Sequence, residues 1–133
     1  MKKITLILIF NIVFTSTLLA ETKSKEVSVP KAYALKCFKS QSANSKIAKS
    51  FGFDLQKLTE RQKKILDLFC KSYCICETNA VKSAGKLTRE VTKLSSGDFI
   101  KFQNDFLKTS QGKKVFKKCD DAAMSAVKAK FSK

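Results

Sequence analysis

Hydrophobic residues recur at three- and four-residue steps in the middle of the chain, between residues 59 and 85. This spacing puts them on one face of a single long α-helix. Thr59 followed by Gln62 is the sequence of a capping box, and Gly85 stands where a helix commonly ends. The stripe consists of Ile65, Leu66, Phe69, Cys70, Tyr73, Cys76, Ala80, Val81 and Ala84. The pattern therefore predicts a central helix over residues 59–85.

Shorter apolar patterns lie on both sides of this helix. Before it, residues 31–40 predict a helix that begins at Pro30, and a small apolar patch over 47–51 is stopped by Gly52. After it, residues 87–94 are ambiguous between helix and loop. Ser95-Ser96-Gly97-Asp98 predicts a break and a fresh N-cap, and an amphipathic helix from Phe99 to about Thr109 follows. Residues 110–112 predict a turn, and residues 113–131 a last helix. The inward residues expected outside the central helix are Tyr33, Ala34, Leu35, Cys37, Phe38, Phe99, Ile100, Phe102, Phe106, Leu107, Val115, Phe116, Cys119, Ala122, Ala123, Ala126 and Val127.

No stretch shows the clean alternation of a strand, so the predicted fold class is all-α. We expect four or five helices packed around the central 59–85 helix and tied by disulfides. Residues 30–133 then form a single helical domain, a size that one modest core can support.

The first twenty residues have the layout of a secretory signal peptide. Lys2 and Lys3 precede an apolar run over 4–14, and small residues lead up to Ala20, although Leu18 stands where a small residue is preferred. An uncleaved anchor is the alternative, but the run is shorter than the roughly 20 residues that a spanning helix needs. We expect residues 1–20 to be removed and residues 21–29 to be a flexible lead-in. A periplasmic or secreted location follows, without a later transmembrane span.

The chain is strongly basic, and lysine supplies most of the charge. Loss of Lys2 and Lys3 with the signal peptide, while all eleven acidic residues remain, lowers the net charge from +16 to +14. Lysine gives point charges rather than bidentate contacts, which argues against sequence-specific nucleic-acid recognition. The charge favours an anionic partner: lipid headgroups, lipopolysaccharide, a cell-wall polymer or an acidic protein. The alternative is a lysine-rich surface that only keeps the protein in solution.

Catalytic patterns are missing from the sequence. The chain has no histidine, which excludes Ser-His and Cys-His pairs, and its four glycines are isolated, so no phosphate-binding loop is formed. We expect no enzyme activity and no cofactor. The function expected is that of a non-catalytic binding or structural module.

Five cysteines in an exported chain predict disulfides with one thiol left over. Cys74 and Cys76 point about 200° apart on a helix, so each needs a different neighbour. We expect Cys76 to bond Cys119. Cys37 then bonds Cys74 or Cys70, and we favour Cys74, which leaves Cys70 as a free thiol. An odd cysteine also permits a disulfide-linked dimer.

The cysteine cluster also admits two other uses. Cys70 and Cys74 lie on one helix face, a spacing that suits Cu(I), and Cys76 is a third sulfur ligand nearby. A periplasmic soft-metal protein or a thiol-redox protein that uses Cys70, Cys74 and Cys76 is therefore the alternative function.

A resemblance adds to this interpretation. It rests on the run Tyr73-Cys74-Ile75-Cys76, the step Leu87-Thr88-x-Glu90, an earlier Cys37 and a single late Cys119. Over residues 31–125 the chain resembles a loose group of small, mostly uncharacterised exported bacterial proteins with a Tyr-Cys-x-Cys helix and one C-terminal cysteine. The resemblance implies an exported, disulfide-tied helical fold and no particular activity. Cys70 departs from the pattern of the group.

Overall fold

The computed structural model describes residues 27–132, so the predicted signal peptide and most of the predicted lead-in lie outside the described residues. The described part of the chain has no strand, and the all-α prediction is confirmed. It forms α2 (Val29–Ser42), α3 (Ser45–Ser50), α4 (Glu60–Ser83), α5 (Arg89–Thr92), α6 (Ser96–Lys108) and α7 (Ser110–Phe131). These six helices exceed the expected four or five because two short segments, α3 and α5, each form a helix of their own.

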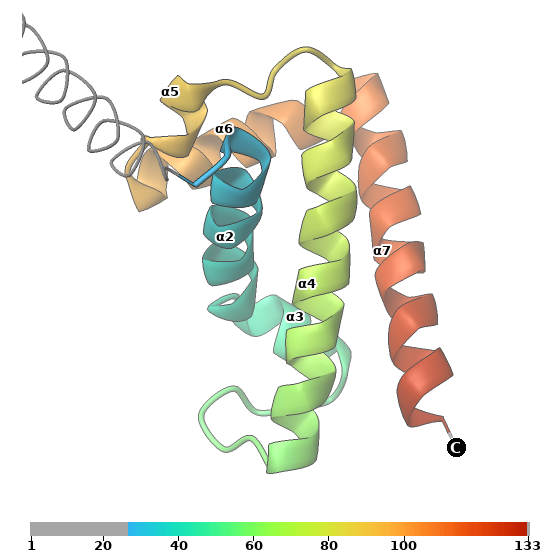
Figure 1. The fold of residues 1–133 in the computed structure, drawn as a ribbon. Coiled ribbons are helices and arrows are strands. Elements are labelled where there is room, and N and C mark those ends of the chain that lie inside the picture. The colour runs from blue at the N-terminus through green and yellow to red at the C-terminus, as the bar shows by residue number, and fades with distance from the viewer. Residues whose placement is uncertain (1–26, 133) are drawn as a thin grey trace, which may run out of the picture.

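Helix α4 occupies the centre of the fold. It packs against α7 on one side and against α2 on the other, and α6 contacts both α2 and α7 (Figure 1). In the view of Figure 1, α2, α4 and α7 run roughly upright, and α6 crosses behind them near one end. The central helix of the sequence prediction is therefore also the central helix of the structure.

Both ends of α4 have the caps that the sequence predicts. The Gln62 backbone N–H donates to Thr59 Oγ1 at 3.2 Å, and the Thr59 N–H donates to the Gln62 side chain at 3.0 Å. At the other end Gly85 adopts φ +72°, a left-handed conformation that glycine accepts without strain. The Lys86 N–H then reaches back to the Val81 carbonyl, which completes a Schellman motif.

The corner between α6 and α7 corrects the prediction of a turn over residues 110–112. Helix α7 begins at Ser110, and Thr109 is at once the C-cap of α6 and the N-cap of α7. Gly112 is buried, and a Cβ placed on it would lie 1.8 Å from the Phe106 carbonyl oxygen. The glycine is therefore needed for the close approach of two helices, not for a turn.

The N-cap of α6 lies inside the run from Ser95 to Asp98 that the sequence predicts as a break and an N-cap. Ser95 is the N-cap, and its hydroxyl accepts a hydrogen bond from the Asp98 N–H at 3.2 Å. Asp98 lies inside the first turn, where its negative charge interacts favourably with the helix dipole. The helix is thus longer at its N-terminal end than predicted.

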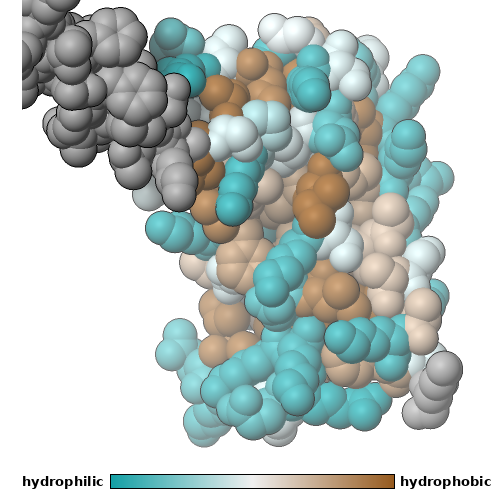
Figure 2. Space-filling model, viewed as in Figure 1, coloured by the Kyte–Doolittle hydropathy of each residue, from teal (hydrophilic) through white to brown (hydrophobic). Residues whose placement is uncertain are grey.

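Most of the expected inward residues are buried or half-buried, but several are not. Leu35 is 50% exposed, Ile100 44% and Phe116 48%, and Ala122 is exposed as well. These residues lie at the edge of the predicted apolar stripes. Neighbouring rows of side chains differ by about 40–60° around a helix, so a stripe drawn one row too wide includes exposed positions. Hydrophilic side chains cover much of the face seen in Figure 2, and hydrophobic groups show between them. Among the described helices, none has the combined length and hydrophobicity that crossing a membrane would require.

Candidate functional site

Two disulfides hold α4 from opposite sides. Cys37 of α2 bonds Cys74, with Cα atoms 5.6 Å apart, and Cys76 bonds Cys119 of α7, with Cα atoms 5.4 Å apart. Both pairs are those favoured from the sequence, because Cys74 and Cys76 face opposite sides of the helix. The choice between Cys74 and Cys70 as the partner of Cys37, which the spacing left open, falls on Cys74. The two bonds join α2 and α7 to α4, and so determine how these three helices lie relative to one another.

Cys70 is the free thiol among the described cysteines, and it is 1% exposed. Burial, and to a smaller extent the nearby Asp67, raise the pKa of this thiol to about 11. A protonated thiol is a poor nucleophile and a poor metal ligand. Cys70 would also have to leave the core before it could form a disulfide with a second chain.

The arrangement of the cysteines bears on the metal and thiol-redox hypotheses. In this structure Cys74 and Cys76 are in disulfides, so neither has a thiolate to offer a soft metal. The part of the chain that the structure describes holds no group of three or more cysteine, histidine, aspartate or glutamate side chains arranged around a common point. The proposed set of Cys70, Cys74 and Cys76 is therefore not brought together as ligands.

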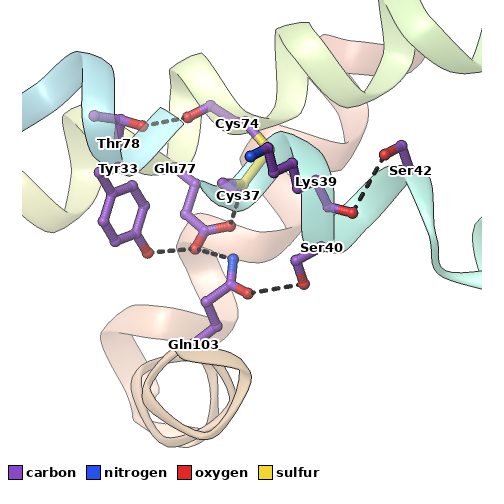
Figure 3. The surroundings of a disulfide bond; sticks show 9 residues. All are labelled: Tyr33, Cys37, Lys39, Ser40, Ser42, Cys74, Glu77, Thr78 and Gln103. Carbon is purple, nitrogen blue, oxygen red and sulfur yellow. Dashed lines mark hydrogen bonds between the residues drawn. A yellow bond between two sulfur atoms is a disulfide. The ribbon is translucent and has the colours of Figure 1, made fainter. Parts of the chain in front are cut away.

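The most unusual polar group of the core is the carboxyl of Glu77, which the sequence analysis missed. Its side chain is 0% exposed. The Tyr33 hydroxyl donates to Glu77 Oε1 at 2.7 Å, and Gln103 Nε2 donates to the same oxygen at 3.0 Å (Figure 3). Ser40 Oγ in turn contacts Gln103 Oε1 at 3.4 Å. The carboxyl thus connects α2, α4 and α6 through polar contacts inside an otherwise apolar core.

The second oxygen of this carboxyl faces a disulfide. Glu77 Oε2 lies 3.7 Å from Cys37 Sγ, and a dashed line marks this contact in Figure 3. The sulfur carries no proton, because it is bonded to Cys74, so it cannot donate to a carboxylate. If the carboxyl is neutral, its own O–H can point toward the sulfur, and no unpaired negative charge faces the disulfide. Burial raises the pKa of Glu77 above its ordinary value, against the hydrogen bonds from Gln103 and Tyr33, which lower it. Geometry and solvation both favour the neutral acid.

Tyr73 lies on the same side of α4 as Glu77. Its hydroxyl lies near the Glu77 carboxyl and interacts with it, but it forms no hydrogen bond of ordinary length and angle with any group of the described residues. Burial raises the pKa of Tyr73, and the Glu77 carboxyl raises it further. Its ring stacks on Phe69 at 6.3 Å and meets the edge of Phe116 at 6.0 Å. The hydroxyl is the least satisfied polar group of the core.

A sequence signal for Glu77 existed. The residue stands four positions after Tyr73, three after Cys74 and seven after Cys70, so it continues the apolar stripe of α4. The predicted stripe contains Cys76 in place of Glu77, although Cys76 is only half-buried in the structure. A charged residue on a predicted buried face is the pattern that points to a paired or neutral carboxyl. Gln103 is 3% exposed and gave the same signal on α6.

The disulfide between α4 and α7 differs from the one between α2 and α4 in its surroundings. A groove of about 420 Å³ runs along α4 and α7, and Cys76, Ile75 and Lys118 line it. Cys37 and Cys74, by contrast, are at most 1% exposed. Only the bond to Cys119 can therefore be approached from the surface without unfolding.

Comparison with known proteins supplied no family assignment. The chain has no significant match among protein-family models, curated proteins or solved structures.

Proposed function

We propose that this protein is a small exported helical module, stabilised by two disulfides, that binds an anionic partner or surface without catalysis. The partner classes are those that an exported protein meets: lipid headgroups, lipopolysaccharide, cell-wall polymers or acidic proteins. A periplasmic or secreted location, reached through a signal peptide over residues 1–20, is part of the proposal. Membership of the loose group of exported Tyr-Cys-x-Cys proteins is proposed on the same footing.

One observation carries the proposal: the positive charge of the surface is largely uncompensated. The chain has 27 basic and eleven acidic residues. In the described residues, Glu60 and Asp67 form ion pairs with Lys63 and Lys71, both exposed and both within α4. Glu77 contributes no negative charge at the surface, because it is buried and its pKa is raised. A field of this kind attracts anions over distances of about 8–10 Å at physiological salt.

The titratable groups of the core support a non-catalytic role. Cys70, Tyr73 and Glu77 are each at most 3% exposed, and the pKa of each is raised. A nucleophilic thiol needs the opposite shift, and a general acid needs access to its substrate. These groups therefore fit a structural role inside the core better than chemistry on a substrate.

The proposal is tested with vesicles. Purified protein is mixed with vesicles that contain an anionic phospholipid, and with vesicles of zwitterionic phospholipid as the control, at several salt concentrations. We expect binding to the anionic vesicles alone, with an affinity that falls steeply as salt rises. Binding that ignores salt, or equal binding to both vesicles, contradicts an electrostatic partner.

A matched pair of variants tests whether the charge acts as a whole. One variant changes four lysines of α7 to glutamine, and the other changes four exposed lysines spread over the rest of the chain. The first set is Lys113, Lys114, Lys117 and Lys118, and the second is Lys31, Lys49, Lys57 and Lys93. Similar losses in the two variants support binding through the overall charge. No loss in either variant contradicts the proposal.

A further inference from the structure

A cavity of about 510 Å³ lies between α2 and α6, and its wall includes Ser40, which contacts Gln103 of the Glu77 network. Lining residues come from both helices and from the residues that follow α2, among them Ala43 and Asn44. Its volume is within the range of roughly 300–1,000 Å³ that is typical of small-molecule sites. The cavity is thus large enough for one small ligand.

The walls of this cavity combine apolar and cationic groups. Ile100 of α6 and Ala43 after α2 supply the exposed apolar surface, with Ile100 44% exposed, while the Phe99 ring is 1% exposed and lies beneath them. Lys36 and Lys39 of α2 supply two positive charges, and none of the lining residues is acidic. An apolar wall beside unbalanced cations complements a molecule with an alkyl chain and a negative head.

The two lysines are held differently. Lys36 Nζ donates to the Leu94 carbonyl and lies 5.6 Å from the centroid of the Phe99 ring, so its charge is fixed at the wall of the cavity. Lys39 is exposed and forms no ion pair with any carboxylate of the described residues. Lys39 therefore has a charge that an anionic head can approach without displacing an existing partner.

We propose that this cavity binds one molecule of a single-chain anionic amphiphile, such as a fatty-acid anion. The alkyl chain lies against Ile100 and Ala43, and the head group meets Lys39, with Lys36 at the wall. The cavity between the two helices has room for one chain, whereas a bilayer surface requires a broad exposed face. The inference rests on the proposed anionic partner and names its chemical class and its place on the protein.

The test uses dodecanoate as the probe, at concentrations below those at which it forms micelles. Calorimetry gives the stoichiometry and the affinity, and amide chemical shifts in NMR locate the site. Lys39→Glu and Ile100→Ser each remove one half of the proposed recognition. Lys117→Glu and Ile75→Ser are the matched controls, because Lys117 is exposed on α7 and Ile75 is 60% exposed on α4, both outside the cavity. Dodecyltrimethylammonium has the same alkyl chain with the opposite charge.

We expect one dodecanoate per protein, with shifts at α2 and α6. Lys39→Glu and Ile100→Ser should each weaken binding at least tenfold, the controls less than threefold, and the cationic amphiphile should bind at least tenfold more weakly. Equal loss in Lys39→Glu and Lys117→Glu overturns the site, because both variants lower the net charge by the same amount. Equal binding of the two amphiphiles, or shifts that lie elsewhere, also overturns it.

The vesicle experiment separates this inference from the proposed function. If anionic vesicles bind in a salt-dependent manner while dodecanoate does not bind, the cavity proposal fails and the general charge proposal survives. If dodecanoate binds as described while vesicles are ignored, the cavity proposal holds and the binding of broad anionic surfaces fails.

Discussion

Glu77 Oε2 lies 3.7 Å from Cys37 Sγ, so a buried carboxyl and a disulfide sulfur are direct neighbours in the core. A negative charge at this place would face a sulfur that has no proton to offer. The contact is therefore consistent with a carboxyl that keeps its own proton. Because the folded and unfolded proteins then differ in the protonation of Glu77, measurements of stability against pH can detect it.

Replacement of Glu77 should show how much of its role depends on shape and how much on charge. In Glu77→Gln the carbonyl oxygen can still accept from Tyr33 and Gln103, so we expect a loss of about 1 kcal/mol or less at neutral pH. In Glu77→Ala the two donors lose their acceptor and a cavity forms, so we expect a loss of about 2–4 kcal/mol. Denaturant unfolding of both variants measures the difference. Equal losses would show that Glu77 is held as a charged group.

Titration of Glu77 should make the free energy of unfolding depend on pH. Because the pKa of Glu77 is raised in the folded protein, the folded state binds more protons than the unfolded state between the two pKa values. The stabilisation is fully present below the unfolded pKa of about 4.3 and is lost as pH rises through the folded pKa. The wild-type protein should therefore lose stability relative to Glu77→Gln from acid toward neutral pH. Parallel stability curves of the two proteins from pH 4 to 8 would contradict a raised pKa.

Gly112 should be intolerant of a side chain, while Gly97 should tolerate one. A Cβ at Gly112 would lie 1.8 Å from the Phe106 carbonyl oxygen, whereas a Cβ at Gly97 meets nothing within 4 Å. We expect Gly112→Ala to lower the free energy of unfolding by about 1–3 kcal/mol or more. Gly97→Ala lies in the first turn of α6 and should raise it by up to about 1 kcal/mol. Thermal unfolding of the two variants, each with one added methyl group, makes the comparison.

The bond between Cys76 and Cys119 should contribute strongly to stability. It closes a loop with a sequence separation of 43 residues. On the chain-entropy model its removal in the double variant Cys76→Ala/Cys119→Ala should lower the stability by about 3–4 kcal/mol. We expect the melting temperature to fall by roughly 10 °C or more. Unfolding of this variant under non-reducing conditions tests the value, and a fall of only one or two degrees would show that α7 is held by packing alone.

The same bond should be the first to be reduced. Cys76 lines an open groove, whereas Cys37 and Cys74 are at most 1% exposed. A phosphine reductant under native conditions should therefore release Cys76 and Cys119 before the other pair. Alkylation of the released thiols at successive times, followed by mass spectrometry, identifies them. Simultaneous release of all four thiols would mean that reduction proceeds through global unfolding.

The parts of the fold that the sequence predicts are those determined by local spacing. The caps of α4 need only Thr59, Gln62 and Gly85, which are read within one segment. The directions of Cys74 and Cys76 follow from the helix period alone, which sends them to different helices but leaves open whether Cys70 or Cys74 bonds Cys37. Local rules therefore position α4 and indicate which helices it must contact.

The parts that were missed depend on contacts between distant segments. Glu77 accepts from Tyr33, which is 44 residues away in the sequence, and from Gln103, which is 26 residues away. The spacing along α4 places Glu77 on the buried face, but it does not show which donors the carboxyl meets there. Gly112 is a similar case. A glycine in the sequence can indicate a turn or a helix that packs closely on a neighbouring carbonyl, and the sequence alone does not distinguish the two. In both cases the tertiary partner decides the structure.

The two disulfides divide the chain into two successive covalent rings. One ring runs from Cys37 to Cys74 and the other from Cys76 to Cys119, and Ile75 is the one residue between them. A single cut of the backbone inside either ring opens that ring but releases no fragment, since the sulfur bond still joins the two sides. The segment from Gly52 to Thr59, which links α3 to α4, lies inside the first ring. A protease that nicks this linker would leave α2 and α3 covalently attached to α4, and the break would become visible only after reduction.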